Sequence, residues 1–247
     1  MCVNLLKSTE FYHAAGIGTA PRARSAKAAA EGNVIIRRHS NSSQKMKLIG
    51  SLTSPYVRKA RIVLAEKKIE VEFVLDNPWN PDTGVAKLTP LNKVPVLVLD
   101  DDSTLFDSRV IVEYLDSVTP NNRLLPAAGR DRIRIKRWEA LADGVLDATV
   151  AVVLESRRPE GQRNPSWIPR QREKIDRSLE MMSEELGEQP WCTGNAFSLA
   201  DVAVGTVLGY LDFRLPDLKW REQHANLARL FDELMARPSF AETVPQG

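Results

Sequence analysis

A proline inside an otherwise apolar run is the feature that most constrains the fold of this chain. Pro95 interrupts the apolar residues 94–99. Because proline has no N–H to donate to a neighbouring strand, it is confined to an edge strand or to the start of a strand. A cis X-Pro bond there can turn the N–H and C=O of the preceding residue away from the sheet. The sequence therefore predicts a strand that begins near Val94 and offers free backbone groups to an extended, peptide-like ligand.

A helix is predicted to begin shortly afterwards with an acid and a hydroxyl. Asp107 and Ser108 precede apolar residues at helical spacing. At a helix N-terminus, Asp107 can take an ammonium group, while Ser108 and the helix N–H groups can take a carboxylate. With Val94, they indicate a site for a small γ-glutamyl-type peptide. A strand-start proline and a helix cap are also ordinary structural features, so the inference depends on their order and spacing, with Ser54 added.

Composition limits the class of protein. The 247 residues fit one large or two ordinary domains, and 43% are hydrophobic. No run of about 18 apolar residues predicts a membrane span. The first 45 residues carry seven Lys/Arg and two Asp/Glu, so the rest has a net charge of −3, and no nucleic-acid partner is expected. With only Cys2 and Cys192, we expect no structural disulfide and a reducing, cytoplasmic location.

Residues 1–45 lack sustained periodicity and are rich in Ala, Ser and Arg. Such a tract can resemble an organellar transit peptide. The alternative is an upstream extension or a misplaced start, because a strand pattern begins at once at Met46. We favour the alternative and expect a disordered N-terminal extension over 1–45.

Residues 46–126 alternate between strand and helix patterns. Ser54 followed by Pro55 is typical of a helix N-cap and first helical position. Strands are predicted at 48–50, 71–75, 94–99 and 105–106, and helices after Ser54 and after Asp107. The resulting β-α-β-α-β-β-α order predicts one sheet with helices on its faces.

Residues 120–129 form a predicted linker, and the chain from 130 onward shows only helical periods. A long helix is predicted over 130–155 and a second apolar stripe over 175–186. Ser198 and Asp201 form a capping box with Asp in place of the usual Glu. A last amphipathic helix over 227–234 is predicted to stop at Arg237-Pro238. The second domain, 130–247, is therefore predicted to be an all-α bundle.

Several motifs in this order resemble the glutathione S-transferase family over nearly all of 46–247. They are Ser54-Pro55-Tyr56-Val57-Arg58, Asn92-Lys93-Val94-Pro95-Val96-Leu97, Phe106-Asp107-Ser108, Trp191, Gly194, residues 198–205 and Arg237-Pro238-Ser239-Phe240. Residues 139–144 and 171–175 further resemble a bacterial subgroup. The resemblance implies a thioredoxin-like domain over 46–126 (α/β) followed by a helical bundle (all-α), glutathione as co-substrate, and a two-fold homodimer. No metal ion is expected, because His13 and His39 lie in the N-terminal extension and His224 near a helix start.

The resemblance also assigns roles to residues. Ser54 matches the residue that hydrogen-bonds the glutathione sulfur, and Val94 the residue before the cis-proline that pairs with the cysteinyl backbone. Asp107 and Ser108 match the acidic-Ser pair that holds the γ-glutamyl group, although the family more often has Glu at the first position. Lys93 can contact the glycyl carboxylate or remain solvated.

The chemistry implied is activation of a thiol. Free glutathione is mostly a thiol at neutral pH, with a pKa near ~8.5, and only the thiolate attacks electrophiles. A hydroxyl at Ser54 and the N-terminus of the helix that it begins can stabilise the anion. Ser51 and Thr53 are nearby hydroxyls that could replace Ser54. A serine instead of a cysteine before Pro55 argues against a thiol-transferase.

The expected activity is conjugation of glutathione to a small apolar electrophile. The alternatives are a glutathione-dependent isomerase, peroxidase or dehalogenase, or a non-catalytic glutathione-binding interaction module. Asp143 and Asp147 share a helix face and are interpreted as solvated or capping acids rather than cleft residues. Four aromatic residues are interpreted as packing rather than as an electrophile pocket, and Cys192 as a packed residue. These aromatic residues are Trp138, Trp167, Tyr210 and Phe213.

Overall fold

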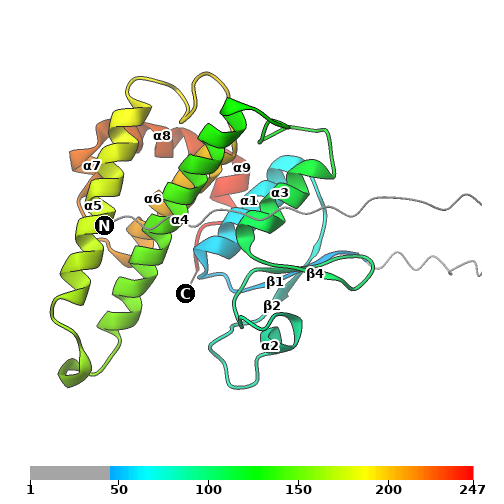
Figure 1. Ribbon diagram of the computed structural model, residues 1–247, viewed down its shortest axis with the longest axis horizontal. Coiled ribbons are helices and arrows are strands. Elements are labelled where there is room, and N and C mark those ends of the chain that lie inside the picture. The colour runs from blue at the N-terminus through cyan, green and yellow to red at the C-terminus, as the bar shows by residue number, and fades with distance from the viewer. Residues whose placement is uncertain (1–44, 247) are drawn as a thin grey trace, which may run out of the picture. The chain divides into compact units, whose positions relative to one another are not determined.

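A computed structural model describes residues 45–246 of the chain. Figure 1 shows the small sheet and the helices that follow it. The strands are β1 (Lys47–Gly50), β2 (Glu72–Leu75), β3 (Val96–Val98) and β4 (Thr104–Leu105). The helices are α1 (Pro55–Lys67), α2 (Val85–Leu88), α3 (Ser108–Ser117), α4 (Arg130–Ser156), α5 (Trp167–Leu186), α6 (Leu199–Arg214), α7 (Trp220–Gln223), α8 (Ala225–Met235) and α9 (Pro238–Ala241), with a 3-10 turn at Glu160–Gln162. The predicted extension lies outside the described residues, apart from Lys45.

The four strands form one mixed sheet in the order β2-β1-β3-β4. β1 runs parallel to β2 and antiparallel to β3, and β3 runs antiparallel to β4. The proline was predicted to lie either on an edge strand or at the start of a strand. The structure shows it at the start of a strand. Pro95 directly precedes β3, which is an internal strand.

Side chains alternate between the two faces of this sheet, as strand geometry requires. Leu48 and Leu97 pack into the main core with α1 and α3, whereas Ile49 and Val96 pack with Val85 of α2 on the opposite face. Figure 1 shows α1 and α3 on one side of the sheet and α2 on the other. Burial is incomplete on the outer strand β2. Its Leu75 is 67% exposed, although the pattern of this strand is apolar.

Helix α6 is the centre of the helical part. Every residue from Leu199 to Leu211 is buried, so this helix is apolar all round rather than amphipathic. It packs against α4, α8 and α1. Its N-terminus is the predicted capping box: Ser198 accepts from Ala200 N–H, and Asp201 accepts from Ser198 N–H at 2.9 Å. The fold is a thioredoxin-like domain followed by a helical domain, as the sequence predicted.

The C-terminal end differs from the prediction. The last amphipathic helix was expected to stop at Arg237-Pro238, and α8 does end at Met235. However, Pro238 occupies the first position of another short helix, α9. Proline is favoured there because its missing N–H would have no helical partner anyway. Phe240 of α9 is fully buried, so this last helix completes the core.

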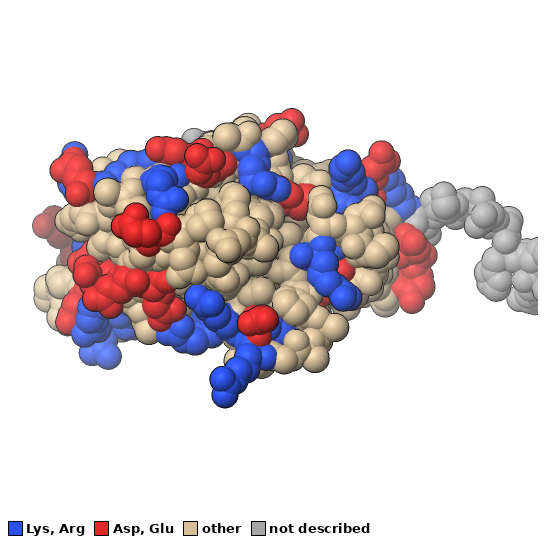
Figure 2. Space-filling model, turned by 90° about the horizontal axis from the view of Figure 1, so that it is seen from above, with Lys and Arg blue, Asp and Glu red and all other residues tan. Residues whose placement is uncertain are grey.

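Charge is mixed on the face seen in Figure 2, where basic and acidic side chains are interspersed around a central area that carries neither. Among residues 45–246, no helix is both long enough and apolar enough to cross a membrane.

Candidate active site

The strand register brings the predicted site segments to one end of the sheet. Ile49 faces Val96, and Leu97 faces Leu105. Because both pairs are antiparallel, the residues after β1, before β3 and after β4 share the same edge. The segment that leads to Ser54, the Val94-Pro95 pair and the Asp107-Ser108 pair therefore lie at that edge.

Val94 offers the backbone groups that the sequence predicted. The Val94–Pro95 peptide bond is cis. In the described part of the chain, neither the N–H nor the C=O of Val94 has a hydrogen-bond partner, because no backbone pair includes it and β3 begins only at Val96. The side chain is half-buried and packs against the cores on the sheet faces. An extended peptide backbone can pair with these two groups.

Ser54 caps α1 through its own oxygen. Its backbone is extended, with φ −80° and ψ 123°, and its Oγ accepts from Val57 N–H at 3.3 Å. Pro55 occupies the first helical position. The Ser54 side chain is half-buried, and its O–H has no acceptor among residues 45–246. The hydroxyl can therefore still donate one hydrogen bond at the positive end of a helix.

The neighbouring hydroxyls are placed differently. Ser51 is buried, and its oxygen lies 3.5 Å from that of Thr53. Both line a cavity of about 550 Å³ with the loop after β2, including Asp76 and Thr83. Ser54 does not line this cavity. Ser54 is therefore the hydroxyl at the helix terminus, and the other two belong to the cavity beside β2.

Asp107 and Ser108 form the N-terminus of α3. Asp107 is the N-cap, and its Oδ1 accepts from Arg109 N–H at 2.9 Å and from Ser108 Oγ at 3.3 Å. Within residues 45–246, Oδ2 of Asp107 and the N–H of Ser108 have no partner. The helix-cap explanation is thus correct for one oxygen of Asp107. The other oxygen can accept an ammonium proton, and the Ser108 N–H can bind a carboxylate.

The Ser108 hydroxyl contacts its neighbour in the pair. Ser108 is only 3% exposed, and its Oγ lies 3.3 Å from Asp107 Oδ1. It can therefore orient the Asp107 carboxylate, while the Ser108 N–H faces the N-terminal end of α3, where a ligand carboxylate can bind.

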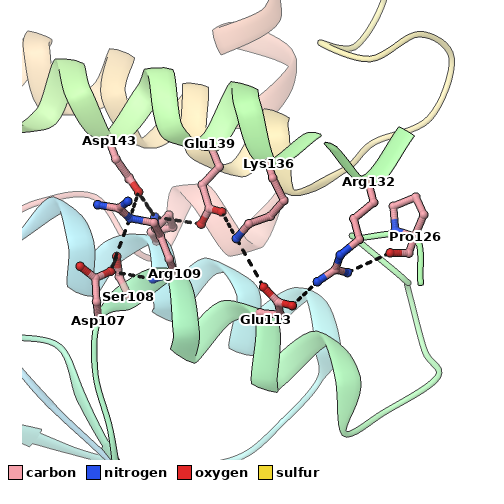
Figure 3. Close-up of polar contacts among 10 residues, drawn as sticks. Asp107, Ser108, Arg109, Glu113, Pro126, Arg132, Lys136, Glu139 and Asp143 are labelled. Carbon is pink, nitrogen blue, oxygen red and sulfur yellow. Dashed lines mark hydrogen bonds and ion pairs between the residues drawn. The ribbon is translucent and has the colours of Figure 1, made fainter. Parts of the chain in front are cut away.

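A buried ionic network joins this helix terminus to α4. Lys59 of α1 donates to Asp143 at 2.8 Å and to Glu139 at 3.1 Å, and its side chain is fully buried. Arg109 Nε also lies 3.0 Å from Asp143. Figure 3 shows Asp143 and Glu139 pointing from α4 toward α3. This network fixes Arg109, the residue beside the Asp107-Ser108 pair, against the helical domain.

The network continues along the two helices, as Figure 3 shows. Lys136 lies 2.5 Å from Glu139 and 3.5 Å from Glu113 of α3. Arg132 also pairs with Glu113 and donates to the carbonyl of Pro126 at 2.9 Å. The linker and both helices are thereby held by one set of alternating charges.

The interpretation of Asp143 as a solvated or capping acid was wrong, whereas Asp147 is exposed, as that interpretation expected. Asp143 is 2% exposed, and burial raises its pKa, although the charge of Lys59 opposes this shift. Asp147 accepts a hydrogen bond from the hydroxyl of Tyr56, two residues after Ser54. The missed signal was Lys59, a lysine within the apolar pattern of α1, because a buried cation needs acidic partners.

Tyr56 is held in its protonated form. Burial and then the hydrogen bond to Asp147 raise the pKa of Tyr56 far above its ordinary value of 10.0. The phenol donates its proton to Asp147. It therefore cannot act as a general base at neutral pH.

The remaining sequence candidates differ in burial. Trp138 and Tyr210 are buried, and Cys192 is a free, fully buried thiol whose pKa is raised well above its ordinary value by burial. Trp167 is 40% exposed, and Lys93 is exposed. Over residues 45–246, no group of three or more His, Cys, Asp or Glu side chains is placed to hold a metal ion.

Comparison with known proteins agrees with this architecture. The model of the glutathione S-transferase N-terminal domain matches residues 53–118, and that of the glutathione S-transferase C-terminal domain matches residues 165–233. A small mixed sheet with a helical second domain defines a two-domain protein with a thioredoxin-like N-terminal half. The chain belongs to the glutathione S-transferase family.

Three relatives give the degree of similarity. A glutathione S-transferase of Methylobacillus flagellatus, solved with glutathione bound, is 50% identical with a TM-score of 0.80, over 81% of this chain and all of that chain. A second glutathione S-transferase, from Methylobacterium radiotolerans and in complex with glutathione sulfonate, is 43% identical with a TM-score of 0.79. The match covers 82% of this chain and 95% of that chain. The uncharacterized GST-like protein YibF of Escherichia coli is 42% identical, over 81% of this chain and 98% of that protein.

Proposed function

We propose that this protein is a glutathione transferase that joins the glutathione sulfur to a small apolar electrophile. One observation carries the proposal: a hydroxyl at a helix N-terminus, a free backbone N–H and C=O at Val94, and the N-terminus of α3 lie at the same end of the sheet. These groups match the sulfur, the cysteinyl backbone and the γ-glutamyl end of glutathione. Structures of relatives with bound glutathione support the choice of co-substrate.

Each residue has a distinct role in this proposal. The cysteinyl N–H and C=O of glutathione pair with Val94. The γ-glutamyl ammonium donates to Oδ2 of Asp107, and the γ-glutamyl carboxylate accepts from the N–H of Ser108 at the positive end of α3. The Ser108 hydroxyl keeps Asp107 in place, and Arg109 holds the helix terminus against Asp143.

Ser54 acts on the sulfur. Its free O–H donates to the thiolate, and α1 contributes roughly half a positive charge at its N-terminus. Both interactions favour the anion over the thiol, so the pKa of the bound thiol falls. The sulfur lone pair then forms the C–S bond, and the leaving group of the electrophile departs with its bonding electrons. Ser54 is a hydrogen-bond donor throughout and forms no covalent bond.

The domain bounds, the location and the oligomeric state of the protein are part of the same proposal. Residues 46–126 form the glutathione-binding domain and 130–247 the helical domain, after an extension over 1–45. We place the protein in the cytoplasm as a homodimer, since Cys192 is unpaired and C₂ is the commonest closed symmetry. The electrophile approaches the sulfur from the side of Tyr56 and Asp147, which come from the two domains.

Thiolate formation tests the proposal. With glutathione bound, ultraviolet thiolate absorbance should titrate below the pH at which free glutathione ionises. Ser54→Ala should retain glutathione binding but lose this shift and most conjugation over an electrophile panel. Thr53→Ala, which removes a hydroxyl one residue away, is the matched control and should retain both.

The possible outcomes separate the alternatives. Unchanged turnover in Ser54→Ala would refute the role of Ser54. Glutathione retention without any thiolate shift in the wild-type protein would identify a binding module. A shift accompanied by isomerisation, peroxide reduction or dehalogenation, without conjugation, would assign a different glutathione-dependent reaction to the same site.

A further inference from the structure

Among residues 45–246, Arg58 is a buried cation without an acidic counterion. It lies on α1, four residues after Ser54, and is 2% exposed. Its Nη2 donates to the carbonyl of Phe240 at 3.3 Å and lies 3.7 Å from the sulfur of Met235. Its Nε and Nη1 are buried, with no hydrogen-bond partner in the described part of the chain. An unpaired buried charge is costly, so this position calls for an explanation.

The unpaired guanidinium borders a cavity of about 280 Å³. The wall consists of Arg58, Gly209 of α6, Phe213, Phe231, Met235 and the C-terminal residues Val244 and Pro245. Gly209 permits the arrangement, because a Cβ at that position would collide with Nη1. Nη1 thus lies directly against the backbone of α6, and Arg58 is one of the residues that line the cavity.

The acid at this cavity is already engaged. Asp212 also lines the wall, but its Oδ1 accepts from Trp220 Nε1 at 2.7 Å and its Oδ2 from Arg221 at 2.9 Å. Asp212 is therefore neutralised by another cation. Burial, and then the nearby charge of Arg61, lower the pKa of Arg58 from 12.5 to about 10. An anion beside the guanidinium would offset the cost of burying its charge.

We propose that this cavity is a second ligand site, which binds a small organic monocarboxylate with an aromatic or branched apolar body. The carboxylate accepts from Nη1 of Arg58, and the apolar body contacts Phe213, Phe231 and Met235. None of Ser54, Val94, Asp107 and Ser108 lines this cavity, so the site is separate from the proposed glutathione site.

The chemistry of the wall selects this class of ligand. A single guanidinium and largely apolar neighbours cannot replace the hydration of a phosphate or of another multiply charged anion. A neutral apolar ligand would fill the space but leave Nη1 unpaired. A monoanion with an apolar body satisfies both requirements.

Benzoate and its neutral analogue benzamide test this on the full-length protein. By titration calorimetry, benzoate should bind at least about 10-fold more tightly than benzamide, because a charge-assisted hydrogen bond distinguishes them. Arg58→Met should lose about 10-fold or more in benzoate affinity. Arg61→Met, which removes the neighbouring charge on the same helix but leaves the cavity wall intact, should change the affinity by less than about threefold.

A second variant keeps the test valid if Arg58→Met does not fold. Val244→Trp, at a residue 42% exposed on the cavity rim, should block benzoate while α1 stays intact. A structure with 4-bromobenzoate should place the bromine by anomalous scattering between Phe213 and Phe231. Equal affinity for benzoate and benzamide, unchanged binding in Val244→Trp, displacement of benzoate by glutathione, or no binding would each overturn the proposal.

Discussion

The ammonium of Lys59 lies 2.8 Å from a carboxylate oxygen of Asp143, and both side chains are almost completely buried at the junction of the two domains. Lys59 belongs to the thioredoxin-like half and Asp143 to α4. A second carboxylate, Glu139, lies 3.1 Å from the same ammonium. The junction is thus held by charge as well as by apolar packing, and its energetics can be tested directly.

Lys59→Met should destabilise the protein strongly. The substitution keeps a stem of similar length but leaves Glu139 and Asp143 buried without their shared cation, which costs about 3–5 kcal/mol for a buried pair. Lys47→Met, at an exposed lysine paired with Glu72, should cost about 0–1 kcal/mol. Denaturant unfolding of both variants checks this prediction. Equal losses would show that the junction depends on packing alone.

The pair of Glu66 and Arg237 should make stability depend on pH. Burial alone would raise the pKa of Glu66, but hydrogen bonds from Arg237 and Ser239 outweigh it and hold the pKa below 4.5. A carboxyl whose pKa is lowered by folding stabilises the protein above its unfolded pKa, and the effect disappears as pH falls through the folded value. Arg237→Met should therefore cost more stability at pH 7 than below about pH 4.

The matched control for this pair is Arg177→Met. Arg177 and Glu173 form an exposed pair on α5, which should contribute about 0–1 kcal/mol. Unfolding free energies of both variants, measured across the acid range, would show whether the Glu66–Arg237 pair makes stability depend on pH. A loss in Arg237→Met that does not change with pH would mean that the contact of Arg237 with the Phe197 ring, rather than the ion pair, stabilises this region.

Tyr56→Phe should leave the pH profile of thiolate formation unchanged. The pKa of Tyr56 is raised by burial and by its hydrogen bond to Asp147, so the phenol remains neutral with its proton donated to Asp147. Ser54→Ala should move the profile, and Tyr56→Phe should not. Titration of bound glutathione by ultraviolet absorbance measures both. A shift in the Tyr56→Phe profile alone would make the phenol, rather than Ser54, the donor to the sulfur.

The capping box at α6 should contribute measurably to stability. Ser198→Ala removes the acceptor for Ala200 N–H at the start of the central helix and should cost about 1–2 kcal/mol. Ser166→Ala, at the exposed N-cap of α5 where the side chain makes no capping bond, is the control and should cost less than about 0.5 kcal/mol. Thermal unfolding of the two variants tests whether the lost stability comes from the capping hydrogen bond or from the exchange of serine for alanine itself.

Local sequence signals predicted the elements and their order. Ser54 with Pro55, Asp107 with Ser108, and Ser198 with Asp201 each mark a helix start through short-range hydrogen bonds, so neighbouring residues suffice to identify them. The fold class followed from the succession of strand and helix periods. The cis bond before Pro95 was also predicted, because a proline within an apolar run leaves few backbone arrangements.

Long-range pairing was not predictable in the same way. Asp143 meets Lys59 only because α4 packs against α1 across 84 positions in the chain, and no local pattern fixes that approach. The same holds for Arg58, whose neighbour Gly209 lies on α6. The role of Asp143 was therefore misread, although the helix face that it shares with Asp147 was evident.

The N–H and C=O that Val94 would offer to glutathione under the proposed function belong to the main chain. Exchanging its side chain leaves that N–H and C=O in place as long as the strand entry keeps its shape. A mutational scan across this segment would accordingly register mainly losses of packing, because every substitution except proline leaves both backbone groups in place. Editing the amide itself, by replacing it with an ester, is the way to see what this position offers.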